Sequence, residues 1–202
     1  MKKILFILLL AISFTAQAKD VVDAKYLKGA VPEINNIICF KKNFSVPGKS
    51  EQEINQTLCR FVKEKLMAPA IQDLRTRMLS EGKEDGTIVA KIEEYMVFKK
   101  KPLYLDRTRF RYQVNIQTKG SDVSMEISQI SYYYNEEIDG TKGIDYRAEE
   151  WISDKEALNK SGKKLYPRSG KFRIKTIDRV EEIFNEAMNV FEAQGHKAVV
   201  EK

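Results

Sequence analysis

The chain has 202 residues, with 35 lysines and arginines against 29 aspartates and glutamates and a formal net charge of +6. Charged residues make up 32% of the chain with both signs interspersed, which indicates a soluble surface and argues against a nucleic-acid-binding footprint. Histidine occurs once and cysteine twice, which argues against metal centres and catalytic sites that need several such residues.

The first 18 residues have the pattern of a secretory signal peptide. Two lysines precede an unbroken apolar run at 4–12, and Ala16 and Ala18 are small residues where signal peptidase cleaves. The run is shorter than the roughly 20 residues that a membrane-spanning helix needs. Lys19 follows instead of the cysteine of a lipoprotein. We expect an exported protein of the periplasm or cell surface; the alternatives are a buried N-terminal helix and an uncleaved anchor.

Removal of residues 1–18 leaves 184 of the 202 residues and a net charge of +4, because two lysines and no acids are lost. This length suits one domain, and no further apolar stretch reaches membrane length. We expect residues 19–36 to form a flexible lead-in, 37–194 a single α+β domain and 195–202 a C-terminal tail. Export and the modest charge both argue against a nucleic-acid partner.

Residues 37–46 alternate in polarity as a β-strand does. The apolar face consists of Ile38, Phe40, Phe44 and Val46. Ser50 and Glu53 then have the spacing of a capping box, which begins a helix. The helix has an apolar stripe suited to packing on a sheet. The stripe consists of Ile54, Leu58, Phe61, Val62 and Leu66.

Pro69 interrupts or kinks this helix. Apolar residues at helical spacing follow it and predict a further helical stretch that ends at Gly82; they are Ile71, Leu74 and Met78. Cys39 lies in the strand and Cys59 in the helix. We expect two separate buried thiols. The alternative, which an oxidising compartment permits, is a disulfide between them.

Three long strand-like segments come next, at 87–98, 107–118 and 123–134. The first changes parity, which predicts a bulge near Glu93 and Glu94. The second alternates cleanly between Phe110, Tyr112, Val114 and Ile116 and a polar set that includes Arg109 and Arg111. A turn at 119–122 leads to the third, whose parity slips near 128–129. This alternation indicates an antiparallel sheet with one face that is either exposed to solvent or covered by other parts of the chain.

The last third of the chain begins with a polar segment at 135–150 that we expect to be a flexible loop. Ser153 and Glu156 predict a second capping box and a short helix. Residues 160–173 read as a basic loop. A long helix is then expected from Thr176 to Gln194, ended by Gly195. Its apolar stripe consists of Ile177, Val180, Phe184, Met188 and Phe191.

Two surfaces are candidates for binding a partner. On the outer face of the sheet we expect Tyr133 beside Arg109 and Arg111, which suits a glycan, a peptide or a partner protein. Cover of this face by the C-terminal loop is the alternative. The second surface is the basic loop, with the candidate residues Lys163, Lys164, Tyr166 and Arg168. A lysine triplet at 99–101 is expected to be a solvated turn, with contact to lipid headgroups or an acidic glycan as the alternative.

The sequence offers little support for a catalytic site. The acidic pairs at 93–94, 136–137 and 149–150 are expected to be solvated charges, and adjacent residues of a strand point to opposite faces. His196 lies beyond the last helix, where a general base would lack positioned partners. We predict no catalytic residue, no cofactor and no metal.

The stretch Phe44-Ser45-Val46-Pro47-Gly48-Lys49-Ser50 with its following helix resembles the opening of DUF4468, a family of exported Bacteroidetes proteins of unknown function. The stretch Ala148-Glu149-Glu150-Trp151, then Leu165-Tyr166 and the last helix, resemble the second half of that family. The likeness covers roughly residues 38–193. It implies a TBP-like fold, with a curved antiparallel sheet and two main helices on one face. It implies no activity, and fold alone does not assign one.

We therefore expect an exported envelope protein, a non-enzymatic binding or accessory domain that contacts a partner through the outer sheet face or the basic loop. The alternative is an unrecognised enzyme that acts on cell-wall or glycan material, which would require convergent carboxylates in a pocket. A chiefly structural accessory to an envelope complex is a further alternative, and it would expose an apolar patch.

Overall fold

A computed structural model describes residues 22–72, 75–136 and 142–200. The predicted signal peptide at 1–18 lies outside the described residues. The strands are β1 (Glu33–Ile34), β2 (Ile37–Ile38), β3 (Phe40–Ser45), β4 (Arg77–Glu81), β5 (Thr87–Lys101), β6 (Tyr104–Lys119), β7 (Asp122–Tyr134), β8 (Ile144–Arg147) and β9 (Val199–Val200). The helices are η1 (Ala24–Tyr26), α1 (Glu51–Phe61), η2 (Val62–Met67), α2 (Asp154–Ala157) and α3 (Pro167–Glu192).

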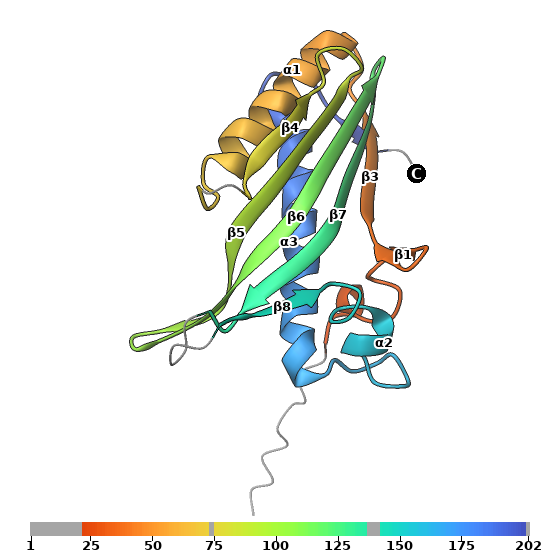
Figure 1. The fold of residues 1–202 in the computed structure, drawn as a ribbon. Coiled ribbons are helices and arrows are strands. Elements are labelled where there is room, and N and C mark those ends of the chain that lie inside the picture. The colour runs from red at the N-terminus through yellow and green to blue at the C-terminus, as the bar shows by residue number, and fades with distance from the viewer. Residues whose placement is uncertain (1–21, 73–74, 137–141, 201–202) are drawn as a thin grey trace, which may run out of the picture.

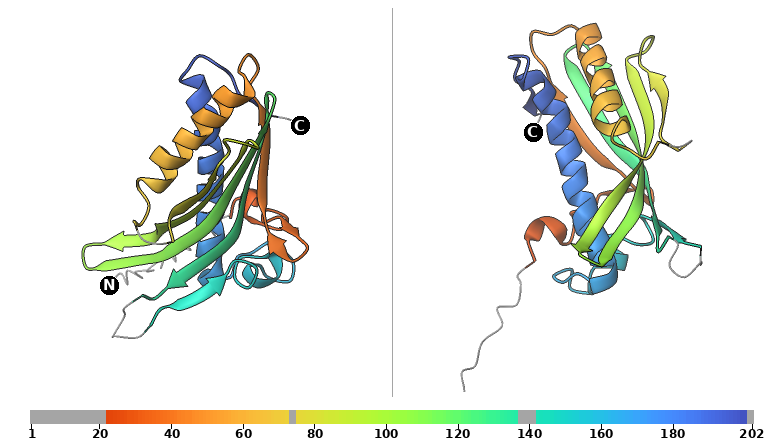
Figure 2. Two further views of the ribbon diagram at one scale, coloured as in Figure 1. Left: turned by 45° about the horizontal axis from the view of Figure 1, so that its top comes forward. Right: turned by 90° about the vertical axis from the view of Figure 1, so that its left-hand side faces the viewer.

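The main sheet is antiparallel, with strand order β4-β5-β6-β7-β3-β9 and β8 paired to β7. The sheet curves, and α1 and α3 both pack on one of its faces (Figures 1 and 2). The predicted α+β architecture, a curved antiparallel sheet with two main helices on one face, is confirmed. The opposite face, which we call the outer face, is the one turned away from α1 and α3.

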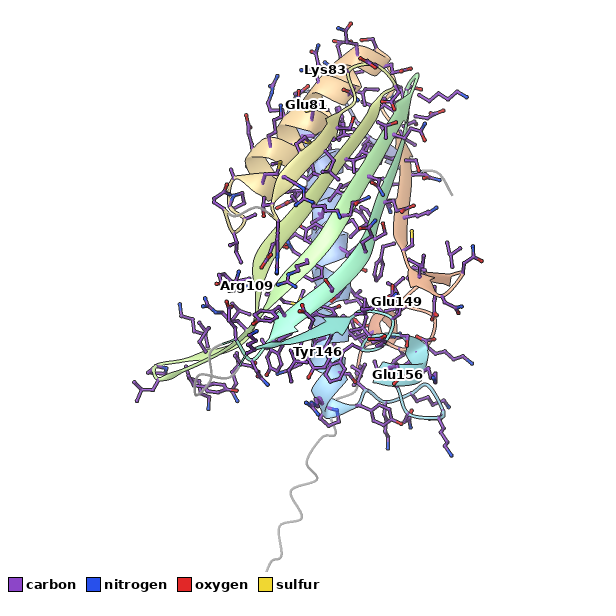
Figure 3. The ribbon with its side chains drawn as sticks, in the orientation of Figure 1. Glu81, Lys83, Arg109, Tyr146, Glu149 and Glu156 are labelled. Atoms are coloured by element: carbon purple, nitrogen blue, oxygen red, sulfur yellow. The ribbon has the colours of Figure 1, made fainter. Side chains whose placement is uncertain are left out.

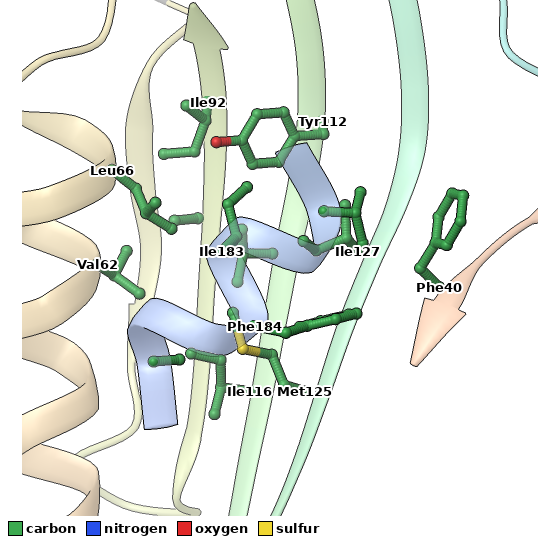
Figure 4. Packing of buried hydrophobic residues seen from close by; sticks show 14 of the residues in the cluster. Phe40, Val62, Leu66, Ile92, Tyr112, Ile116, Met125, Ile127, Ile183 and Phe184 are labelled. Atoms are coloured by element: carbon green, nitrogen blue, oxygen red, sulfur yellow. The ribbon is translucent and has the colours of Figure 1, made fainter. Parts of the chain in front are cut away.

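The core lies between the sheet and the two helices, and its side chains come from the predicted apolar positions. Figure 4 shows Val62 and Leu66 meeting Ile92 of β5 and Ile183 of α3. All residues of the predicted stripe in α1 and η2 are buried. The predicted cap of α1 is also formed, because the Ser50 hydroxyl accepts from the Glu53 amide and the Glu53 carboxylate accepts from the Ser50 amide.

The two cysteines are free and both are buried, as expected for separate thiols. The parity slip in β7 is confirmed as well. The β6–β7 register shifts between Arg111 and Gln113, and Gln129 has a φ of 52°. Such an extra residue in one strand is a β-bulge, and it keeps Ile127 and Ile130 both in the core.

The predicted helical stretch between Pro69 and Gly82 is wrong, because Arg77–Glu81 forms strand β4 on the edge of β5. The apolar residues of this segment favour a helix only weakly, whereas the unpaired edge of β5 offers hydrogen-bond partners to the whole backbone of a strand. Pairing with that edge satisfies the backbone groups of both segments, which outweighs a local preference.

The bulge predicted near Glu93 and Glu94 is also misplaced. β5 pairs with β6 without interruption there, and the register shifts instead between Val97 and Lys99. The parity therefore continues, and Glu94 points to the helix-covered face. Arg179 of α3 lies there with its Nε 2.8 Å from Glu94 Oε1, so an ion pair accommodates the acid on a face that is otherwise apolar.

Three expectations for the last third of the chain need correction. Residues 144–147 of the predicted polar loop form β8. Helix α2 is present, but the Ser153 hydroxyl makes no capping bond. Helix α3 begins at Pro167 instead of Thr176, because proline is well suited to the first position of a helix. The basic loop is therefore shorter than predicted, and Arg173 belongs to the helix, where it is fully buried.

Candidate functional site

The outer face carries rows of polar side chains that run across the strands. Cross-strand partners lie on the same face of a sheet, so the register defines these rows. Three rows lie side by side: Arg77–Lys91–Gln113, Glu93–Arg111–Ser131–Arg147 and Tyr95–Arg109–Tyr133–Asp145. Arg107 continues the line of Arg109 and Arg111 along β6, since residues two apart in a strand point the same way. We call these rows the arginine face.

Glu93 lies at the centre of the arginine face and its side chain is fully buried. Its Oε1 is 3.1 Å from Arg109 Nη1, and its Oε2 is 3.3 Å from Arg111 Nε and 3.6 Å from Arg75 Nη1. A buried carboxylate without such compensation would be costly. Glu93 thus positions three guanidinium groups around one buried carboxylate.

Two further carboxylates flank the cluster. Glu136 forms a two-pronged ion pair with Arg109, in which the distance from Arg109 Nε to Glu136 Oε2 is 2.8 Å. The donated hydrogen bonds of Arg109 lower the pKa of Glu136 below its usual value. Asp145 Oδ1 accepts from Arg111 Nη1 at 2.6 Å. Glu136 is therefore held in the charged form as a partner of Arg109, and Asp145 is an ion-pair partner of Arg111.

Two adjoining pockets open on the arginine face. The first, of about 300 Å³, is lined by Arg75, Arg77, Lys91, Ile92, Arg111, Tyr112, Gln113, Gln129 and Ser131. The second, of about 670 Å³, is lined by Arg75, Arg109, Arg111, Tyr133, Glu136, Lys142, Gly143 and Asp145. Arg75 and Arg111 line both, so the two pockets form one groove. Four cations, two amides and a hydroxyl surround the first pocket, which is a donor-rich lining suited to an anionic group.

Comparison with known proteins places this architecture in a family. A solved DUF4468 family protein from Bacteroides ovatus is 35% identical, with a TM-score of 0.75, over 84% of this chain and 94% of that one. The chain belongs to the DUF4468 family. The sequence model of that family, described as a domain of unknown function with TBP-like fold, matches residues 40–133.

A second solved structure supports the fold of this DUF4468 protein. A TBP-like protein from Parabacteroides distasonis has a TM-score of 0.65 at 20% identity, over 80% of this chain and 96% of that one. No curated protein matches the chain. The predicted family resemblance is confirmed, and the span matched by the family model includes Arg109, Arg111 and Tyr133.

The structure brings three of the predicted site residues of this DUF4468 protein together. The Arg111 guanidinium carbon lies 5.2 Å from the Tyr133 ring centroid, and Arg109 lies beside both in the second pocket, near the base of the β5–β6 hairpin (Figure 3). Tyr133 is half-buried, because Gly143, just before β8, lies against its ring. The Gly143 amide donates to the Tyr133 hydroxyl at 3.0 Å, and a Cβ on Gly143 would come within 2.6 Å of the ring.

The other predicted residues lie on a separate surface beside α2. The amides of Lys163 and Lys164 donate to Asn159 Oδ1, each at 3.1 Å, which shapes a tight exposed loop. Tyr166 is the N-cap residue of α3. The guanidinium carbon of Arg168 lies 5.4 Å from the Trp151 ring centroid. The pockets of the arginine face are lined by none of these residues.

Sequence reasoning missed the buried acid at the centre of the site. Glu93 and Glu94 were expected to be solvated. Glu93 is instead fully buried, and the side chain of Glu94 is only 15% exposed. The two do point to opposite faces, as the strand geometry requires. Arg75, Arg77 and Lys91 were also missed. The signal was the alternation itself, since Lys91 and Glu93 share the parity that Arg109 and Arg111 follow in the next strand.

Within the described residues, no group of three or more histidine, cysteine, aspartate or glutamate side chains is arranged to hold a metal ion. The same part of the chain contains no helix long and apolar enough to cross a membrane.

Proposed function

We propose that this DUF4468 protein is an exported envelope domain that binds an anionic partner, an acidic glycan or the acidic segment of a protein, through the arginine face. One observation carries the proposal. The groove concentrates cations on a sheet face that the two main helices leave uncovered, and the carboxylates within it are already paired with arginines. Incoming carboxylate, sulfate or phosphate groups would meet donors that are held in place before binding, which lowers the entropic cost of binding.

Export is supported by the pattern of residues 1–18. A binding role, as opposed to hydrolysis, is supported by the state of the carboxylates. A general acid needs a proton to donate near neutral pH. Arg109 lowers the pKa of Glu136 and so keeps it charged. Glu93 is enclosed by arginines, which leaves it no path to a substrate.

Lys91 and Arg77 are the residues to change first, because both line the groove and they are cross-strand partners on its surface. The variant R77Q/K91Q should weaken binding of polygalacturonate and of poly-L-glutamate about tenfold or more, as expected for the loss of charge-assisted contacts. Isothermal titration calorimetry at two salt concentrations measures this. Dextran, which is uncharged, provides the ligand control.

The exposed loop beside α2 offers a matched protein control. The variant K163Q/K164Q removes the same number of positive charges from the second predicted surface. Binding that is lost in K163Q/K164Q and kept in R77Q/K91Q would move the site to that loop. If neither polymer binds the wild-type protein at low salt, the proposal of an anionic partner on the arginine face is wrong.

A further inference from the structure

The β5–β6 hairpin continues beyond the body of the protein. β5 and β6 pair as far as Lys101 and Tyr104, and Pro102 and Leu103 form the turn. Figures 1 and 2 show this end of the two strands projecting past the rest of the sheet. Each residue from 99 to 105 is exposed. The tip therefore contributes nothing to the core, although it contains three large apolar side chains.

Those side chains are unusually open to solvent. Leu103 has a relative exposure of 102%, Tyr104 of 54% and Leu105 of 47%. Single exposed apolar residues are common, but three in succession at the end of a projecting element indicate a contact surface. Leucine and tyrosine are the residue types that enter the boundary between headgroups and acyl chains of a bilayer.

Positive charge lies directly beside the apolar tip. Lys99, Lys100 and Lys101 occupy β5, and their cross-strand partners are Asp106, Leu105 and Tyr104. The one acid here, Asp106, is already paired, because its Oδ2 lies 2.7 Å from Nζ of Lys171 on α3. The end of the hairpin thus presents an apolar strand next to a basic strand. Lysine side chains can extend to headgroups while neighbouring apolar side chains enter the acyl region.

The base of the hairpin is firmly attached to the body. The register shift between Val97 and Lys99 leaves Phe98 unpaired in the ladder, and its ring packs 4.5 Å from Phe172 of α3 and 6.0 Å from Tyr134. Together with the Asp106–Lys171 pair, this contact fixes the hairpin from both strands. A rigid base lets the tip enter an interface without rearrangement of the sheet.

We propose that the tip at residues 99–105 docks the protein onto the surface of an anionic phospholipid bilayer. The three apolar side chains enter the interface and the lysine triplet contacts acidic headgroups. The charge decides between a bilayer and an apolar groove of a protein, since three adjacent lysines around an apolar tip match a dense layer of negative headgroups. This docking is independent of the arginine face, and either proposal can fail alone.

Cosedimentation with vesicles tests the proposal on the purified protein. Vesicles of phosphatidylcholine mixed with phosphatidylglycerol should bind it, and vesicles of phosphatidylcholine alone should bind it much less. The variant K99Q/K100Q/K101Q should lower partitioning about fivefold for each lysine removed. The variant L103S/Y104S/L105S should lower it about tenfold or more.

Matched variants at other surfaces distinguish binding through the tip from nonspecific binding of the protein to vesicles. K160Q/K163Q/K164Q removes three exposed lysines from the loop beside α2, and I34S/I37S removes two apolar side chains of about half exposure. Both should bind vesicles as the wild type does. A second readout uses L103W, whose fluorescence should shift to shorter wavelength when anionic vesicles are added.

Three outcomes would overturn the proposal. The first is a wild-type protein that does not sediment with anionic vesicles. The second is a control variant that loses as much binding as the tip variants. The third is a dimer in solution that the tip variant dissociates while vesicles have no effect, which would assign the tip to contact between copies of the chain.

Discussion

The most demanding prediction concerns Arg173, which is fully buried in the first half of α3. Its guanidinium donates to the carbonyl oxygens of Tyr26 and Ile152 at 2.7 Å each and of Leu27 at 2.6 Å. It also lies 2.6 Å from Asp154 Oδ1. One side chain thus joins the segment before β1, the segment before α2 and the longest helix. We propose replacing it with methionine, which keeps most of the volume and removes each donor.

The magnitude follows from the acceptors left behind. Three carbonyl oxygens and one carboxylate would lose a charged donor, and each such bond contributes about 1.5–3 kcal/mol when considered alone. Asp154 is 36% exposed and water can solvate it, so its share is smaller. Removal of one partner of a buried charged contact costs about 3–5 kcal/mol in total. For a domain of this size, that loss lowers the melting temperature by about 6–20 °C.

Two assays check this prediction. Thermal and urea unfolding of R173M give the global loss of stability. Hydrogen exchange measured by mass spectrometry reports the local loss, which should concentrate in residues 22–36. The control is R168M on the same helix, whose exposed guanidinium only stacks near Trp151 and should cost well under about 1 kcal/mol. An R173M protein that stays within 1 kcal/mol of R168M, with unchanged exchange, would refute the reasoning.

Hydrogen bonds donated by Ser50 lower the pKa of Glu53 to about 2 from its ordinary 4.5, so its contribution to stability is present above pH 4.5 and lost as the pH falls toward 2. The difference in unfolding free energy between wild type and E53Q, measured by urea unfolding, should disappear as the pH falls from 4.5 to 2. A difference that persists at pH 2 would contradict this prediction. Both thiols are buried, and burial raises the pKa of the Cys39 thiol to about 11. Because neither thiol is accessible, iodoacetamide should modify Cys39 and Cys59 only after denaturation without reductant; denatured protein with no adduct would mean a disulfide. Intact mass of the envelope fraction should correspond to a chain that begins at Lys19, whereas full-length chain in the cytoplasm would remove the basis for export.

The predicted outer face shows where sequence reasoning succeeded and where it stopped. Alternation along 107–118 placed Arg109 and Arg111 on the face opposite the core, and the structure confirms this. The same alternation placed Tyr133 beside them once the parity slip at 128–129 was taken into account. Glu93 was left as a solvated charge, because its burial depends on three arginines that come from two other segments of the chain.

The errors in element assignment share one physical origin. β4 forms because the edge of β5 offers backbone partners, and Glu94 occupies the inner face because Arg179 reaches it from α3. Helix α3 begins early because residues 167–175 pack against the lead segment and the aromatic cluster around Phe172. Each decision rests on contacts between residues far apart in the chain, which a local pattern does not contain.

By itself, the sequence determined which side chains of α1, β6 and β7 face the core, where α1 begins, and the family to which the chain belongs. The alternation of polar and apolar residues and the capping of a helix each depend on a few neighbouring residues, so the sequence alone shows them. Only the tertiary structure decided that a buried Glu93 gathers arginines into a groove, that Phe98 and Asp106 anchor a projecting hairpin, and that Arg173 secures the segment before β1. Charges at these places are tolerated only when partners distant in sequence meet them, and the fold alone brings those partners together.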